Sequence, residues 1–132
     1  MSQWTHVNSS FRLDSLGAIT DDDIYDVFGR HVGFYDDFDG EYKTTPMGSE
    51  GSLEISIYHN PEESHLAAAQ VSVFGDLRDF GGKKDIEKLK QWFDECCKKF
   101  AVRQAVIQIR DEWEEDEIVY TYRVGEDEDD ED

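Results

Sequence analysis

The chain has few basic residues. Its 132 residues include 13 Lys and Arg against 32 Asp and Glu, which gives a formal net charge of -19. A surface that binds nucleic acid or an anionic membrane unaided has to neutralise phosphate groups, so this composition argues against both ligands. It favours the inverse possibility, in which the chain offers a phosphate-like surface to a basic protein that normally binds nucleic acid.

Long apolar runs and dispersed cysteines are also missing. No stretch approaches the roughly 18–20 apolar residues that cross a membrane, and residues 1–5 lack the basic start of a signal peptide. The only cysteines, Cys96 and Cys97, are neighbours in a predicted helix, where adjacent side chains point about 100° apart and are poorly placed to bridge one another. We therefore expect reduced thiols and a cytoplasmic protein.

The carboxylates are numerous near the C-terminus but are not confined to it. Residues 126–132 are seven consecutive carboxylates, and the remaining chain still carries a formal charge of -12. Such a run repels itself and cannot bury apolar area, so we expect residues 126–132 to form a disordered acidic tail. Hydrophobic residues make up 38% of the chain, enough for a single α+β domain over residues 1–125.

Hydrophobic patterning predicts seven elements in the order β-α-β-β-α-β-β. Strands are predicted over residues 4–13, 53–58, 67–74, 102–109 and 118–124, and helices over residues 21–28 and 83–100. Residues 33–51 contain several glycines and a proline and are predicted to be a long loop. The first six elements match the split βαβ (ferredoxin-like) arrangement. We expect a two-layer sandwich, with an antiparallel sheet, two helices on one face and an extra C-terminal strand.

Two local signals mark the first helix. Thr20 is a predicted N-cap, and the aspartates that follow it place negative charge at the positive end of the helix dipole. Gly29 is predicted to end this helix. On the first strand, Val7, Phe11 and Leu13 alternate with polar residues and should face the core.

No metal site is predicted. Aligning Gly40 with the glycine of a calcium-binding EF-hand loop places Tyr35 and Pro46 at the two end positions, where oxygen ligands are required. His59 and His65 bracket a predicted hairpin turn and could approach one zinc ion, although solvated histidines are the more common outcome at such a turn. We expect no cofactor.

No catalytic group is predicted either. Ser9 and Ser10 lie near His6 on a strand, without an orienting acid or a nucleophile turn. Residues 74–82 are rich in glycine and could hold an anion at a helix start, but they contain Asp76 and Asp79 and fit no phosphate-binding pattern. We interpret this segment as a strand-to-helix turn and the protein as a non-enzyme.

The binding residues that we predict form two acidic patches and one apolar face. The partner-binding carboxylates are Asp21, Asp22, Asp23, Asp26, Asp36, Asp37, Asp39, Glu41, Glu112, Glu114 and Asp116. Alternate residues of an extended chain are about 6.6–6.8 Å apart, which would space Glu112, Glu114 and Asp116 on a phosphate-like scale. Trp4, Tyr58 and Phe74 fall opposite the core-facing positions and are candidates for contact with a second subunit.

Three segments resemble small uncharacterised proteins of bacteriophages and prophages: residues 4–7 (WTHV), 48–53 (GSEGSL) and 74–79 (FGDLRD). The resemblance implies no known active site. It implies a protein of the host cytoplasm and raises the expectation of a phage-encoded inhibitor, several of which are acidic mimics of nucleic acid.

These observations lead to one main hypothesis and two alternatives. The main hypothesis is a non-enzymatic acidic protein that inhibits a nucleic-acid-handling host protein by mimicking DNA charge. The first alternative is a homo-oligomeric structural or assembly protein, and the second is an immunity-type protein that neutralises a basic toxin.

A truncation tests the reading of the tail. Removing residues 126–132 changes the formal charge from -19 to -12 and removes no apolar group. We expect unchanged or slightly higher thermal stability, most visibly at low ionic strength, because charge repulsion in the folded state falls. Thermal unfolding at two salt concentrations measures this. A loss of several kcal/mol would mean that the tail contributes to the fold.

Overall fold

The computed structural model describes residues 4–15, 19–33, 42–59, 67–100, 102–112 and 117–124. Within these residues the protein is an α+β structure with the predicted order of elements. The elements are β1 (Trp4–Ser15), α1 (Asp21–Phe28), β2 (Glu54–His59), β3 (Ala67–Arg78), α2 (Gly82–Lys99), β4 (Val102–Asp111) and β5 (Glu117–Arg123).

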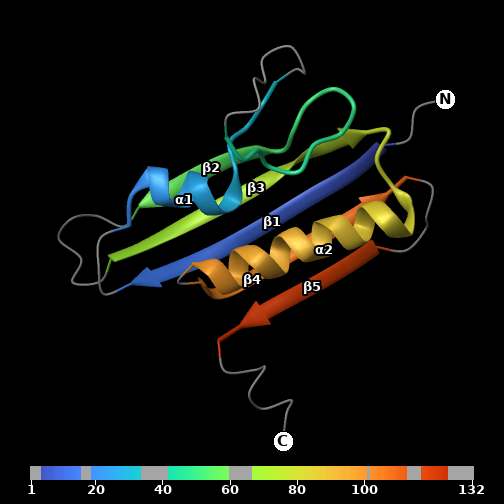
Figure 1. Cartoon of the computed structure of the whole chain (residues 1–132). Coiled ribbons are helices and arrows are strands. Elements are labelled where there is room, and N and C mark those ends of the chain that lie inside the picture. The colour runs from blue at the N-terminus through green and yellow to red at the C-terminus, as the bar shows by residue number, and fades with distance from the viewer. Residues whose placement is uncertain are drawn as a thin grey trace, which may run out of the picture.

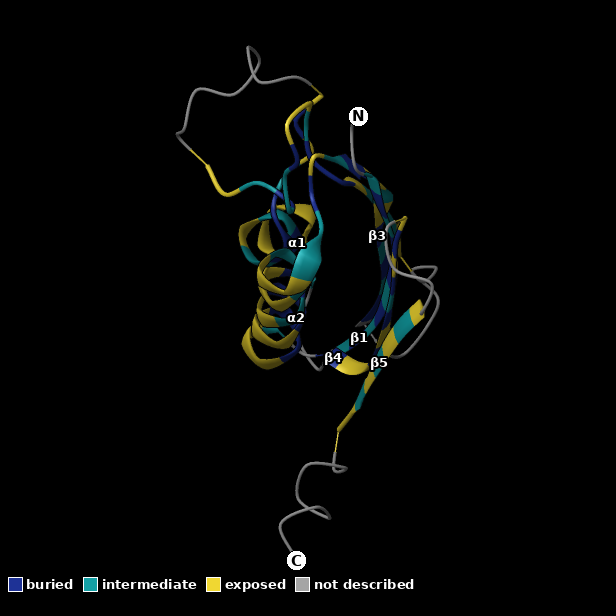
Figure 2. Cartoon of the chain, turned by 90° about the vertical axis from the view of Figure 1, so that its right-hand side faces the viewer, coloured by how far each residue is buried: buried dark blue, intermediate teal, exposed yellow. Residues whose placement is uncertain are grey.

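The five strands form one open antiparallel sheet. Their order across the sheet is β2-β3-β1-β4-β5, so the first strand lies in the middle (Figure 1). Figure 2 shows both helices on the same side of this sheet, with buried residues between the helices and the strands. The opposite side of the sheet, here called the open face, is covered by no described helix or strand.

Alternation along β1 decides which residues enter the core. The odd-numbered residues from Thr5 to Leu13 are buried, whereas the even-numbered residues from Trp4 to Asp14 are half-buried or exposed. Phe11 is fully buried, and its ring centroid lies 4.7 Å from that of Phe28 and 5.4 Å from that of Phe93. The predicted inward orientation of Val7, Phe11 and Leu13 is therefore confirmed.

The ends of α1 also agree with the sequence signals. The backbone N–H of Asp23 donates to Oγ1 of Thr20 at 3.1 Å, as an N-cap should, and Gly29 follows the helix with a φ of 104°. A Cβ at Gly29 would lie 2.3 Å from the backbone carbon of Thr44, so no other residue fits there without a backbone shift. The indole N–H of Trp92 donates to the carbonyl of Phe28 and ties α2 to the end of α1.

The prediction that residues 74–82 form a turn is wrong for most of the segment. β3 continues through Phe74 to Arg78, because β1 is long enough to pair with it as far as Trp4. At Gly75, the backbone of β3 lies close to the side chain of Leu53. This glycine has a φ of 141°, and an added Cβ would lie 3.4 Å from the Leu53 side chain. The turn itself begins at Asp79, just before α2.

Both cysteines are buried, and no disulfide joins them. Burial raises the pKa of the Cys96 thiol to about 12, so this thiol stays protonated and unreactive at neutral pH. No helix among the described residues is long and apolar enough to cross a membrane. The predicted acidic tail, residues 126–132, lies outside the described residues.

Two phenylalanines on opposite faces of the sheet test this assignment. Phe11→Ala should lower the free energy of unfolding by about 3–5 kcal/mol, because it removes the centre of the aromatic cluster. Phe74→Ala is the matched control and should cost less than about 1 kcal/mol, since its ring is already 37% exposed. Chemical denaturation measures both. Equal losses would contradict the assignment of the two faces.

Candidate functional site

The described residues hold an unequal share of the charge. They contain all 13 basic residues but only 16 of the 32 carboxylates, a balance of -3. The other 16 carboxylates fall in four segments that contain no Lys or Arg: residues 34–41, 60–66, 113–116 and 125–132. The described residues taken together are therefore close to neutral, and half of the carboxylates of the chain lie outside them.

The described part of one predicted acidic patch, which extends in the sequence from Asp21 to Glu41, lies on α1. Asp21, Asp22, Asp23 and Asp26 are all exposed. Two of them have partners, because the Asp21 carboxylate lies 2.5 Å from Nε2 of His59 and that of Asp22 lies 3.4 Å from the Arg30 guanidinium. The Asp21 contact joins the start of α1 to the end of β2 and gives His59 a carboxylate partner.

The second predicted patch consists of Glu112, Glu114 and Asp116, and the structure describes only Glu112. Glu112 follows β4, is exposed, and its backbone N–H donates to the carbonyl of Trp4. The remaining predicted carboxylates lie outside the described residues: Asp36, Asp37, Asp39, Glu41, Glu114 and Asp116. The calcium-like loop from Tyr35 to Glu41 and the second histidine of the predicted hairpin, His65, lie outside them as well.

The predicted apolar face is not one cluster. Trp4 is half-buried, Phe74 is 37% exposed and Tyr58 is 59% exposed. In the strand register, Trp4 lies opposite Arg78 and Tyr58 lies opposite Gln70, so each is offset from Phe74 by four residues along β3. Four residues of a strand span about 13 Å, which separates the three rings. Phe74 instead shares a cross-strand row with Val119, another exposed apolar residue.

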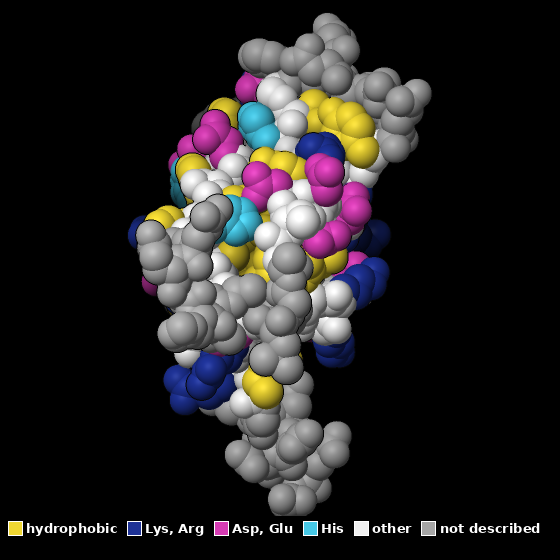
Figure 3. Space-filling view, turned by 90° about the vertical axis from the view of Figure 1, so that its left-hand side faces the viewer, with side chains coloured by type: hydrophobic (Ala, Val, Ile, Leu, Met, Phe, Trp, Pro, Cys, Tyr) yellow, Lys and Arg dark blue, Asp and Glu magenta, His cyan; other side chains and the backbone are white. Residues whose placement is uncertain are grey.

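Most arginines lie on the strands, and most lysines lie on α2. Five of the six arginines lie on strands, whereas six of the seven lysines lie on α2. Figure 3 shows one end of the molecule, with carboxylate and histidine side chains gathered over its upper half and most of the basic side chains lower down. The near-neutral body therefore has local regions of either sign.

One end of the open face is centred on His6. Its Nδ1 lies 2.5 Å from Asp76 on β3, and its Nε2 lies 3.4 Å from Glu112 beyond β4. The hydrogen bond to Asp76 raises the pKa of His6 above its ordinary value of 6.5. Burial opposes this rise, while the charges of both carboxylates add to it. A depression of about 470 Å³ lies beside this group and is lined by His6, Phe74, Asp76, Gln108, Arg110 and Glu117, among others.

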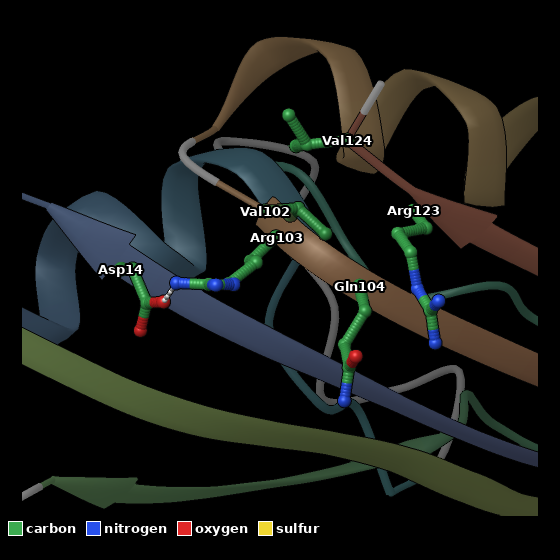
Figure 4. A pocket seen from close by; sticks show the side chains of 6 residues that line it. All are labelled: Asp14, Val102, Arg103, Gln104, Arg123 and Val124. Carbon is green, nitrogen blue, oxygen red and sulfur yellow. Dashed lines mark hydrogen bonds and ion pairs between the residues drawn. The ribbon is translucent and has the colours of Figure 1, made fainter. Parts of the chain in front are cut away.

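The other end of the open face is an arginine groove, defined here by Arg12, Arg103, Arg123, Gln104 and Asp14. A depression of about 580 Å³ is lined by Asp14, Val102, Arg103, Gln104, Arg123 and Val124 (Figure 4). The Asp14 carboxylate accepts hydrogen bonds from Nε of Arg12 at 3.0 Å and from Nη1 of Arg103 at 3.2 Å.

An irregularity in the pairing of β1 with β4 creates this groove. Arg12 pairs with Gln104 and Leu13 pairs with Val102, which leaves Arg103 as an extra residue. Such a bulge redirects a side chain, and here two consecutive residues of β4, Arg103 and Gln104, are both exposed. The sequence analysis did not find the groove, because its arginines come from three distant segments and their meeting depends on register.

The described residues contain no group of three or more side chains that could hold a metal ion. Comparison of the chain with models of protein families, with curated proteins and with solved structures found no match.

The contact between His6 and Asp76 predicts a specific pH dependence. The folded state holds the His6 proton more tightly than the unfolded state, so the stabilisation is fully present below pH 6.5 and is lost as the pH rises through the folded-state pKa. NMR titration of the imidazole should show a pKa above 6.5, and Asp76→Asn should lower it. A His6 pKa at or below 6.5 in the unmodified protein would contradict the contact.

Proposed function

We propose that this chain is a non-enzymatic binding protein that captures a basic protein partner through its acidic segments. The observation that carries the proposal is the division of charge. Sixteen carboxylates and no basic residue occur in four short segments, while the described body has a balance of only -3. An excess of carboxylates that served only solubility could include some Lys and Arg residues in the same segments, whereas a surface that binds a basic protein favours carboxylates alone.

The exposed aspartates of α1 extend this acidic character to the described body. Neither Asp23 nor Asp26 forms an ion pair with a described residue, and both are exposed. Exposed carboxylates of this kind raise the association rate with a basic surface, and their effect weakens as salt increases. The acidic segments and α1 together are the proposed partner-binding surface.

The proposed partner is a nucleic-acid-handling protein of a bacterial host. Basic clefts that bind phosphate are the surfaces to which dense carboxylates are complementary. The resemblance to phage proteins supports the role of an inhibitor that competes with DNA. An immunity-type protein directed at a basic toxin would use the same surface.

A pair of charge-matched variants tests this proposal against a DNA-binding protein captured from bacterial lysate. The test variant carries Asp36→Asn, Asp37→Asn, Asp39→Asn and Glu41→Gln. The control carries Glu54→Gln, Glu87→Gln, Asp94→Asn and Glu95→Gln, which change the net charge equally on exposed positions of β2 and α2. We expect the association rate to fall about tenfold in the test variant and about threefold or less in the control.

A displacement experiment with the same captured partner tests whether the chain competes with nucleic acid. The unmodified chain should release labelled duplex DNA from the partner at low salt and should lose this ability as salt rises. Binding that persists at high salt while the DNA stays bound would contradict the proposal. Equal effects of the two charge-matched variants would show that net charge, and not the acidic segment, controls association.

A second candidate function is homo-oligomerisation through the open face. The observation that favours it is a set of exposed apolar residues on the sheet, namely Tyr58, Phe74, Val106 and Val119. Light scattering at high protein concentration tests it. A stable oligomer that dissociates in Phe74→Ser would support this function, and a monomer at every concentration would contradict it.

We also infer that the first six elements form the split βαβ (ferredoxin-like) unit. The order β2-β3-β1-β4, with all neighbours antiparallel, and the two helices on one side of the sheet support this assignment. In this interpretation β5 is an addition at the free edge of β4. It covers that edge and brings Arg123 beside Gln104.

A further inference from the structure

We propose that the arginine groove is an oxyanion-binding site, which takes a phosphate or carboxylate group at the guanidinium of Arg123 and the amide of Gln104, beside the ion-paired cluster of Arg12, Asp14 and Arg103. This site lies on the open face and does not depend on the proposed function. Three guanidinium groups and one carboxylate give the groove a local charge of about +2, opposite to that of the whole chain.

Asp14 prearranges two of the three arginines. Its side chain is only 16% exposed, and its two oxygens accept from Arg12 and Arg103 separately. Each guanidinium has five N–H donors, so one hydrogen bond to Asp14 leaves several donors on each arginine for an anion. The carboxylate thus restrains the side chains without consuming their capacity to bind.

Arg123 supplies the third guanidinium. It lies opposite Gln104 in the register of β4 and β5, and Figure 4 shows the two side chains next to each other at the depression. No carboxylate among the described residues pairs with Arg123. A charged donor beside an amide donor, both facing one depression, matches a pair of oxygens of a phosphate or carboxylate group.

The neighbouring surface would contact the rest of the ligand. A second depression of about 320 Å³ shares Gln104 and Arg123 with the first and is also lined by Ser10, Arg12, Gln70 and Thr121. Ala105, Val106 and Tyr122 line this depression as well, so the surface next to the groove offers both polar and apolar contacts to whatever carries the oxyanion.

Two sources could supply this oxyanion. One is a separate phosphorylated or carboxylated molecule. The other is the chain itself, because the seven carboxylates of residues 126–132 begin two residues after Val124, which lines the groove. A comparison of the full chain with a chain that ends at Gly125 separates the two sources.

NMR titration with pyrophosphate tests the site in both chains. We expect saturable shifts of the backbone amides of Arg103, Gln104 and Arg123. Arg123→Gln should weaken binding about tenfold, the loss expected for one charge-assisted hydrogen bond of roughly 1.4 kcal/mol. The control Arg30→Gln, an arginine that pairs with Asp22 outside the groove, should change binding less than twofold.

Each outcome decides the proposal. Equal binding of pyrophosphate by both chains supports a site for a separate ligand. Stronger binding of pyrophosphate by the shortened chain supports the site and indicates that residues 126–132 compete for it. Absence of saturable shifts in both chains overturns the proposal, as does an equal loss in Arg123→Gln and Arg30→Gln. Because Arg123 is exposed and has no described partner, its substitution should leave the fold intact, which the undisturbed amide spectrum confirms.

Discussion

The central position of β1 is the constraint on which the rest of the structure depends. This strand pairs with β3 and β4 along nearly its whole length, so its alternation fixes which face of both neighbours can be buried. Phe11 reaches both helices from β1. A slip by one residue would bury His6, Ser10 and Arg12 and expose Phe11, which explains why the register is strongly determined.

The register of β1 also organises the polar chemistry of the open face. Residues that alternate with the core positions form cross-strand rows, and each row combines side chains from distant segments. His6 meets Asp76 at one end, while Arg12 lies beside Gln70 and Gln104 at the other. The same alternation that hides the apolar residues therefore places His6, Asp76 and Arg110 at one end of the open face and Arg12, Gln70 and Gln104 at the other, without any motif in the local sequence.

The sequence predicted the elements well because their signals are local. Alternation, the Thr20 cap and the helical spacing of α2 depend on residues near one another, and each agrees with the structure. The end of β3 was missed because pairing with a long β1 outweighs the tendency of Gly75 to mark a turn. The arginine groove was missed because it requires both the strand order and the bulge at Arg103.

The net charge of the chain does not determine what a local site such as the arginine groove can bind. A charge of -19 governs long-range attraction, but screening confines it to about 8–10 Å at physiological salt. A bound anion would lie about 3 Å from the guanidinium donors, where direct hydrogen bonds outweigh more distant carboxylates. A strongly acidic chain can therefore repel polyanions as a whole and still have a local site for a single oxyanion, as proposed for Arg123 and Gln104. The basic partner that we propose would be attracted by segments that lie elsewhere in the sequence.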